Sequence, residues 1–290
     1  HLVTLADPDY PKALLEITDP PPFLYAKGNL SLLNQASIAI VGSRNASVQG
    51  EKNAEAFAHD LCGYGLCIVS GLALGIDGAA HRGALKTNGA TIAVVGTGLD
   101  IVYPAKHRDL AHQIAERGLI ISEFSLGTPS KPQNFPKRNR IISGLSMGCL
   151  VVEANLQSGS QITARMAAEQ GREVFAMPGS IHSPMSKGCH QLIKQGAKLV
   201  DCLQDIVEDL GLDRLNLANV LVANDAENMS TKASGLINPL LTIMGFEPIA
   251  LENLVRLSHL TVSEVSSMLM LLELEGKVSS LAGGQYQKIV

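Results

Sequence analysis

Seven short apolar runs, rich in β-branched residues, recur between residues 38 and 200, and stretches of helical length separate most of them. These runs carry no polar alternation, so helices must cover both faces of each strand, as they do in parallel sheets. The sequence therefore predicts an α/β fold with a doubly wound, Rossmann-like and mostly parallel sheet. The predicted strands are residues 38–41, 67–69, 91–95, 119–122, 149–153, 173–176 and 198–200.

The segments on either side of this sheet have a different character. Residues 10–33 are rich in proline and predict an extended segment that leans on the main domain, whereas residues 210–234 lose periodicity, which is typical of a linker. The last segment predicts a winged helix, with helices at 238–244, 250–257 and 262–274 and a hairpin of 277–281 and 285–289. We expect four parts, namely a lead-in (1–34), a Rossmann-like domain (35–210), a linker (211–235) and a winged-helix domain (236–290).

Composition narrows the classes of function. No apolar run approaches the roughly 20 residues of a membrane span and no signal sequence is visible, so we expect a cytoplasmic protein. The five cysteines are scattered without a CxxC pair, and we expect reduced thiols, no metal and no cofactor. The net charge of −4 means that any nucleic-acid site must be a local basic patch. Because the sequence starts at His1 rather than at a methionine, we expect further residues before it.

A glycine turn follows the first predicted core strand, at the end of the sheet where open parallel sheets bind their ligands. It reads Gly42-Ser43-Arg44 and lacks the GxGxxG pattern of dinucleotide-binding folds. The turn offers a hydroxyl, backbone N–H groups at a helix start and a guanidinium, a combination suited to a phosphate. A cation at a helix N-terminus is unfavourable unless an anion is bound, which favours this interpretation over an ordinary surface arginine.

Small residues follow the second predicted strand, in the stretch from Ser70 and Gly71 to Gly75. They would let a helix N-terminus approach the backbone of a ligand, which bulky residues would prevent. Asp77 and His81 lie one helical turn apart, and we expect a hydrogen bond between them within the helix. An acid/base pair or two metal ligands are the alternatives for these two residues.

A basic segment, residues 131–140, carries four cations, no acid and one aromatic ring in a chain with only 4% aromatics. Cations for phosphates beside a ring on which a base can stack are typical of single-strand binding, although a charge run is also typical of a solvated surface. Hydroxyl and N–H donors open a later helix at Ser158, Gly159 and Thr163. The candidates from the basic segment are Lys131, Phe135, Lys137, Arg138, Asn139 and Arg140.

Longer motifs occur in a fixed order along the chain. They are GSR at 42–44, SGLALGIDGAAH at 70–81, GTGLDIVYP at 96–104, NFPKRNRIISGLS at 134–146, EANLQSGSQITA at 153–164 and MPGS at 177–180. In sequence, order and spacing they resemble the DprA/Smf family. The resemblance implies a protein that binds and protects single-stranded DNA and helps to load RecA during natural transformation and recombination, with no accepted catalytic activity. It also implies a homodimer through the Rossmann-like domain, with residues 162–177 as a candidate contact, and adds Lys106 to the DNA-binding residues.

Two other classes of function share parts of this pattern. Rossmann-type enzymes that cleave nucleoside monophosphates carry a PGGxGT-like element, and the nearest stretch here, residues 177–181, has neither its second glycine nor its threonine. A regulator that reads a promoter with the winged helix would need cations on its third helix, and residues 262–274 contain none. We therefore expect a contact with protein, or a structural role, for the winged helix.

Overall fold

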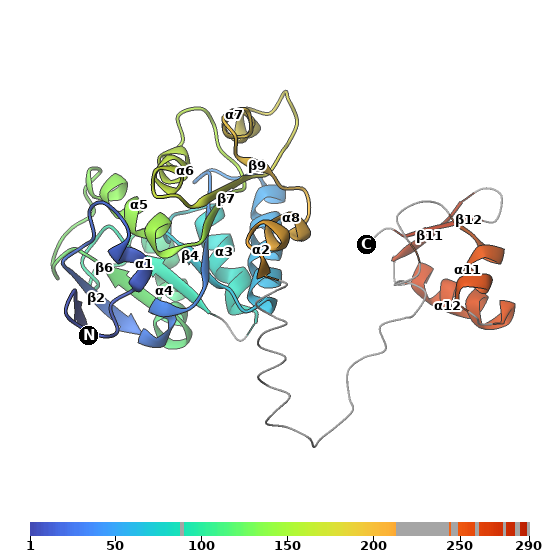
Figure 1. Cartoon of the computed structure of the whole chain (residues 1–290), viewed down its shortest axis with the longest axis horizontal. Helices are drawn as coiled ribbons and strands as arrows, with labels where there is room; N and C mark the ends of the chain where they lie inside the picture. The colour runs from blue at the N-terminus through green and yellow to red at the C-terminus, as the bar shows by residue number, and fades with distance from the viewer. Residues whose placement is uncertain are drawn as a thin grey trace, which may run out of the picture. The chain divides into compact units, whose positions relative to one another are not determined.

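The computed structural model describes residues 1–87, 90–212, 244, 249–258, 261–274, 277–281 and 285–288 (Figure 1). The chain divides into two compact units, His1–Asn224 and Asp225–Val290, and each is described by itself. Among the described residues, no helix has both the length and the apolar character that crossing a membrane requires.

The first unit is built on a nine-stranded sheet in the order β1-β2-β6-β5-β4-β3-β7-β8-β9. All seven predicted core strands are present and pair in parallel, which confirms the predicted fold class. β4, β5 and β6 follow β3 in turn on one side of it, whereas β7, β8 and β9 lie on the other side of β3. The strand order therefore reverses between β3 and β7. The seven strands are β3 (Ser37–Val41), β4 (Cys67–Ser70), β5 (Thr91–Val94), β6 (Leu119–Ser122), β7 (Gly148–Val151), β8 (Glu173–Ala176) and β9 (Lys198–Leu199).

Two antiparallel strands extend the sheet at its β6 edge. β2 (Phe23–Gly28) pairs with β6, and β1 (Leu2–Thr4) pairs with β2; α1 (Lys12–Leu15) and a short 3₁₀ helix (Leu30–Asn34) complete this region. The sequence does not predict these strands, because three consecutive prolines come directly before β2. Yet β2 carries a strand signal, since Leu24 and Ala26 are buried and their neighbours are more exposed. The predicted lead-in thus contributes strands to the main sheet.

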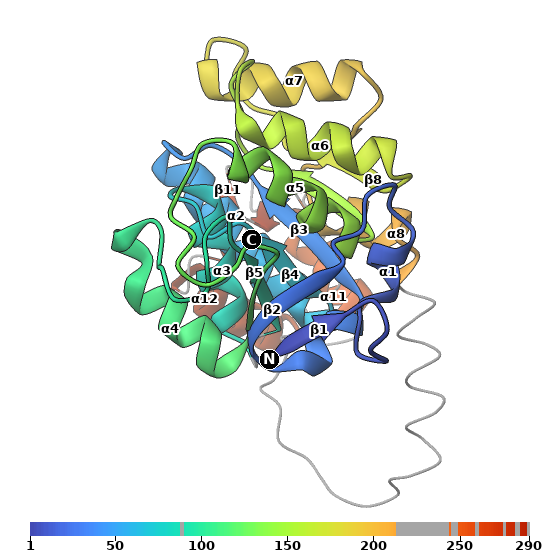
Figure 2. The same ribbon diagram turned by 90° about the vertical axis from the view of Figure 1, so that its left-hand side faces the viewer.

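Helices cover both faces of the sheet because each central strand sends alternate apolar side chains to opposite sides. Ala39 and Val41 of β3 pack in one cluster with α1, α5, α6 and α7, while Ile38 and Ile40 pack in another with α2, α3 and α8. Figure 2 shows α5 beside α6 on the first face. The helices are α2 (Val48–Gly63), α3 (Ile76–Leu85), α4 (Arg108–Arg117), α5 (Asn134–Leu145), α6 (Gly159–Glu169), α7 (Lys187–Lys194) and α8 (Leu203–Asp209), with 3₁₀ turns at Ala105–His107 and Pro184–Ser186.

The second unit is a small α/β module with its own core. It contains β10 (Ile249–Ala250), α11 (Leu251–Ser258), α12 (Val262–Leu274) and the antiparallel strands β11 (Val278–Leu281) and β12 (Gln285–Lys288). Leu254, Val265 and Leu269 are buried between them. Two predicted helices and the predicted hairpin are present. The first predicted helix, 238–244, lies outside the described residues except for Met244, and so does the predicted linker from residue 213 on.

Candidate functional site

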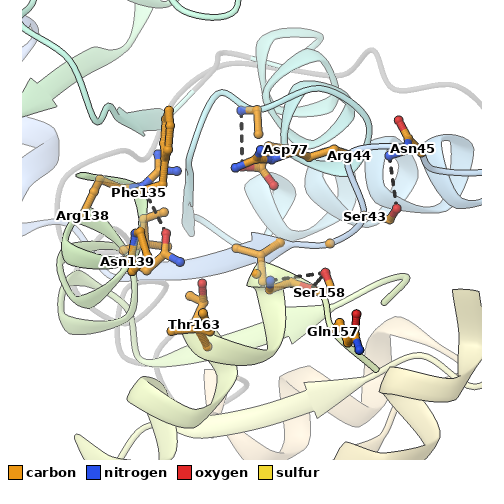
Figure 3. A pocket seen from close by; sticks show the side chains of 18 of the residues that line it. Ser43, Arg44, Asn45, Asp77, Phe135, Arg138, Asn139, Gln157, Ser158 and Thr163 are labelled. Atoms are coloured by element: carbon orange, nitrogen blue, oxygen red, sulfur yellow. Dashed lines mark hydrogen bonds between the residues drawn. The ribbon is translucent and has the colours of Figure 1, made fainter. Parts of the chain in front are cut away.

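A pocket of about 660 Å³ lies at the point where the strand order reverses between β3 and β7. Three segments line most of it, namely the turn after β3, the first turns of α5, and the loop that leads from β7 into α6 (Figure 3). This is the place where open α/β sheets bind ligands, because the loops diverge on either side of the reversal and leave a crevice. The volume is in the range of ordinary ligand pockets.

The turn after β3 is held on two sides by backbone contacts. The Ser43 N–H donates to the Glu153 carbonyl at 2.7 Å, and the Ser43 carbonyl accepts from the Ile76 N–H at 3.2 Å. Gly75 has a φ of +71°, and a Cβ there would lie 2.3 Å from the Ser43 carbonyl oxygen. Only glycine combines this backbone conformation with so close an approach. The turn is therefore rigid at its base and presents the exposed side chain of Arg44 to the pocket.

Arg44 belongs to a row of three neighbouring planar groups at the wall of the pocket. Its guanidinium carbon lies 5.4 Å from the centre of the Phe135 ring, within the range of a cation–π contact. The Tyr103 ring also lies beside Phe135, with ring centroids 5.6 Å apart and the ring planes tilted by 37°. Tyr103 is 44% exposed. Tyr103 is not among the site residues predicted from the sequence, although an aromatic residue in the glycine-containing segment after β5 could have indicated it.

Arg138 forms the floor of the pocket rather than a free cation at its surface. It is only 4% exposed and donates from Nη1 to the carbonyls of Gly71, at 2.7 Å, and Val94. Asp77 lies beside it and accepts from the backbone N–H groups of Gly71 and Ala73. Burial raises the pKa of Asp77, although the charge of Arg138 acts to lower it. Burial likewise lowers the pKa of Arg138 to about 10, although the charge of Asp77 acts to raise it. Arg138 thereby ties α5 to the ends of β4 and β5.

The N-terminus of α6 closes the opposite side of the pocket. Ser158 is its N-cap, and its hydroxyl accepts from the Ser160 N–H at 3.4 Å. The hydroxyls of Ser158 and Ser160 also form a hydrogen bond of 2.7 Å. Thr163 follows one turn later and is buried. The first N–H groups of a helix carry partial positive charge, so this wall attracts an anion.

The structure brings only part of the candidate set together. The predicted residues that line the pocket are Gly42, Ser43, Arg44, Phe135, Arg138, Asn139, Ser158, Gly159 and Thr163. Ser70, Gly71 and Gly75 lie in the supporting layer, where the Ser70 hydroxyl donates to the Ile40 carbonyl at 2.6 Å. Lys106, Lys131 and Lys137 are exposed and are not among the lining residues.

Arg140 lies outside the pocket and already has two acidic partners. Its guanidinium donates to both carboxylate oxygens of Glu123, at 3.2 and 2.7 Å, and to Asp19 at 3.0 Å. A cation held in this way is poorly placed to receive a phosphate. Neither partner is close to Arg140 in sequence, so the charge run alone does not reveal the pairing.

The predicted hydrogen bond between Asp77 and His81 is wrong. The Asp77 carboxylate faces the backbone amides described above, whereas His81 Nδ1 lies 2.8 Å from the Thr91 hydroxyl. His81 is fully buried, and this burial lowers its pKa to about 3. Its imidazole is therefore neutral at physiological pH.

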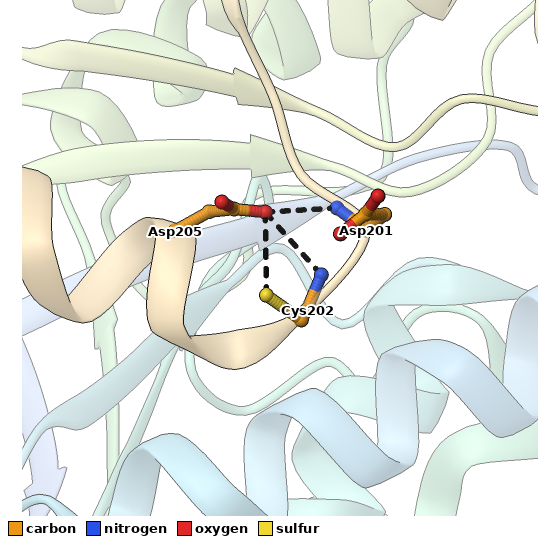
Figure 4. Close-up of side chains that lie close together, drawn as sticks. All are labelled: Asp201, Cys202 and Asp205. Carbon is orange, nitrogen blue, oxygen red and sulfur yellow. Dashed lines mark hydrogen bonds between the residues drawn. The ribbon is translucent and has the colours of Figure 1, made fainter. Parts of the chain in front are cut away.

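One cluster of potential metal ligands, Asp201, Cys202 and Asp205, occurs at the start of α8 among the described residues (Figure 4). An Asp205 carboxylate oxygen accepts from the backbone N–H groups of Asp201 and Cys202 and from the Cys202 thiol. This is a capping box, which satisfies the free N–H groups at a helix start. The arrangement is explained by the helix and does not require an ion.

Fold and site together define a Rossmann-type α/β protein with an anion-attracting pocket at the strand-order reversal and a second, winged-helix domain. The profile of the DNA recombination-mediator protein A family matches residues 1–211, and that of the DprA winged helix domain matches residues 226–284. The chain belongs to this family, the DprA/Smf proteins.

Named relatives agree over most of the chain. It is 44% identical to protein Smf of Escherichia coli, over 98% of this chain and 76% of the relative, and 49% identical to the DNA processing protein DprA of Streptococcus pneumoniae, over 71% and 73%. The crystal structure of the pneumococcal protein superposes with a TM-score of 0.70 at 48% identity, covering 72% of this chain and 73% of the other. A structure of DNA processing protein A from Helicobacter pylori, whose description concerns the single-stranded DNA binding mode of that protein, superposes with a TM-score of 0.67 at 32% identity. It covers 73% of this chain and 97% of the other.

Proposed function

We propose that this protein binds single-stranded DNA in the pocket between β3 and β7, protects the strand, and helps to load RecA onto it in the cytoplasm during recombination, natural transformation included. The observation that carries the proposal is the position of the Arg44 guanidinium, 5.4 Å from the centre of the Phe135 ring and opposite the N-terminus of α6. A phosphate can be received by the guanidinium and the helix N–H groups, while a base stacks on an aromatic side chain.

Local charge supports this proposal in a chain whose net charge is −4. Arg44 is exposed at the pocket, and Lys131 and Lys137 are exposed next to lining residues on either side of Phe135. A strand that leaves the pocket along the start of α5 would pass these lysines. Each phosphate neutralised by a cation releases counterions, so affinity should depend on salt even though the whole protein is acidic.

The state of the acidic group in the pocket supports binding rather than turnover. Asp77 is 6% exposed, its Oδ2 accepts from two backbone amides, and the nearby Arg138 lowers its pKa against the effect of burial. This oxygen is therefore committed to the loop after β4 rather than to a substrate proton, as a general base would need. Homologous proteins described as DNA processing or single-strand-binding proteins are consistent with the same role.

An apolar hollow on the far edge of the sheet supports the proposed homodimer. It has a volume of about 600 Å³ and lies among α7, β9 and the loops beside them. Leu156, Ile181 and Leu199 remain 59%, 65% and 43% exposed there. In the segment predicted as a contact, residues 162–177, Ala164 and Phe175 are core side chains whereas Ile162 is 41% exposed. We propose that the contact with a second copy is centred on the hollow.

The proposal is tested by fluorescence anisotropy with a labelled oligo-dT strand and with a duplex of the same length. Preference for the strand, with an affinity that falls steeply as salt is raised, is the expected result. Preference for the duplex would move the DNA-binding role away from this pocket. The RecA step is tested separately, by measuring whether this protein accelerates assembly of RecA on a strand already covered by a single-strand-binding protein.

A further inference from the structure

Two helix N-termini meet at the strand-order reversal, that of α2 after β3 and that of α6 after β7. In dinucleotide-binding folds, the helix after the first strand receives the ligand's pyrophosphate at its N-terminus. In this protein a carboxylate from the chain itself is at that position. Glu153 accepts from the Ser47 N–H at 2.9 Å through one oxygen and from the Ser47 hydroxyl at 2.5 Å through the other.

The first turn of α2 is shaped around this carboxylate. A Cβ on Gly50 would lie 2.4 Å from the carboxylate carbon of Glu153, so the glycine provides the space that the group occupies. The Ser47 hydroxyl accepts from the Gly50 N–H at 2.9 Å while it donates to Glu153. Glu153 and Ser47 are 106 positions apart in the sequence. The contact is therefore a property of the fold and not of local chain geometry.

Glu153 also holds the other end of the same turn. Its backbone carbonyl accepts from the Ser43 N–H at 2.7 Å, while its side chain holds Ser47. Arg44 lies between these two attachment points. One residue at the end of β7 thereby fixes the stretch of chain that carries the exposed guanidinium.

From this geometry we infer that Glu153 is a positioning and specificity-determining residue of the pocket. It sets Arg44 in place, and its carboxylate takes the position at α2 that a free phosphate or mononucleotide would need. Negative charge at α2 cancels the attraction of that helix N-terminus, so the anion-attracting groups left in the pocket are Arg44 and the start of α6. The DNA part of this inference rests on the proposed function, whereas exclusion of small phosphates from α2 can be measured without DNA.

The exclusion is tested by thermal melting of the full chain in sodium phosphate and in sodium chloride of equal ionic strength. Glu153→Ala empties the space beside Gly50, and Glu153→Gln fills it without the charge. We expect phosphate, relative to chloride, to raise the melting temperature of Glu153→Ala by more than it raises that of the parent or of Glu153→Gln, in which only Arg44 and the start of α6 attract the anion. A shift in the alanine variant no larger than that of the parent would show that no anion-binding position lies behind the carboxylate.

A second substitution reaches the same space from the other side and keeps the proposal testable if Glu153→Ala does not fold. Gly50→Ala leaves Glu153 present but places a methyl group where its carboxylate lies. If Glu153 only stabilised the fold, this change would only alter stability. We expect it also to weaken binding of oligo-dT, because the turn with Arg44 is released.

The positioning role is tested by a double-mutant cycle with oligo-dT as ligand. We expect Glu153→Ala to weaken binding roughly tenfold in the parent and to have little further effect in the Arg44→Ala background, because residues that act together give non-additive effects. Additive losses, or unchanged binding in Glu153→Ala, would overturn the role. If the parent itself does not bind oligo-dT, the proposed function fails. The effect of phosphate on the melting temperature still decides whether Glu153 occupies an anion-binding position at α2.

Discussion

Substitution of Arg44 by alanine is the sharpest test of how the pocket holds a strand. The side chain is exposed and its guanidinium contacts the Phe135 ring, so its removal leaves the packed core unchanged. A hydrogen bond to a charged group contributes about 1.5–3 kcal/mol, and loss of one phosphate contact should therefore weaken binding about 10- to 150-fold. Arg44→Lys should fall between the two, because lysine keeps the charge but lacks the flat, forked group.

The assay is anisotropy titration of a labelled oligo-dT strand at several salt concentrations. Removal of one phosphate contact should also lower the slope of log affinity against log salt by about 1. Lys27→Ala is the matched control, since this exposed lysine lies on β2 and pairs in register with Ile120 at the start of β6, away from the carboxyl ends of the strands. Equal losses in the Arg44 and Lys27 variants, or an unchanged salt slope for Arg44→Ala, would refute the reasoning.

Four further predictions follow from particular contacts. Phe135→Leu should weaken oligo-dT binding about 5- to 150-fold with little change in salt slope, because stacking contributes about 1–3 kcal/mol per base and releases no counterion; an altered slope would contradict this. Leu199→Asp should shift sedimentation toward a monomer, whereas a dimer that persists would exclude the α7 and β9 hollow as its contact. A chain truncated after residue 224 should bind oligo-dT with the affinity of the full chain, since the winged-helix segment 237–290 carries five Glu against one Arg and two Lys; a large loss would assign DNA binding to that unit. His81 is neutral in the folded protein, where its pKa is about 3, whereas its ordinary pKa is 6.5. Between these two pH values the imidazole binds a proton in the unfolded state but not in the folded state. The free energy of unfolding therefore falls as the pH drops from 6.5 toward 3. His81→Gln should therefore lose less stability than the parent from pH 7 to pH 5, by about 2 kcal/mol in urea titrations, and parallel losses would contradict the neutral buried imidazole.

Much of the central sheet can be predicted from the sequence because buried parallel strands leave a clear signal. The run 38–41 is apolar on both faces since helices cover both sides of β3. The β2 strand is harder to predict, because its alternation is short and directly follows three prolines. Antiparallel pairing with β6 depends on contacts between segments that are distant in the sequence.

The pocket is predictable where residues follow strand ends and less so where charged residues find distant partners. Ser43 and Arg44 come directly after β3, so the fold itself places them at the reversal. Arg138 and Arg140 look alike in the sequence, yet one is buried against backbone carbonyls and the other is paired with Glu123. Only tertiary structure separates them. Glu153 is similar, because its partner Ser47 lies on another element.

The most direct test of the central claim is to locate where a bound strand touches the protein. An oligo-dT strand with a single 5-iododeoxyuridine can be cross-linked to the full chain by light, and the modified peptide identified by mass spectrometry. Cross-links at Tyr103 or Phe135 are the expected result, because these rings lie beside Arg44 in the pocket. Cross-links confined to residues 249–288 would contradict the account, because the strand would then be bound by the winged helix.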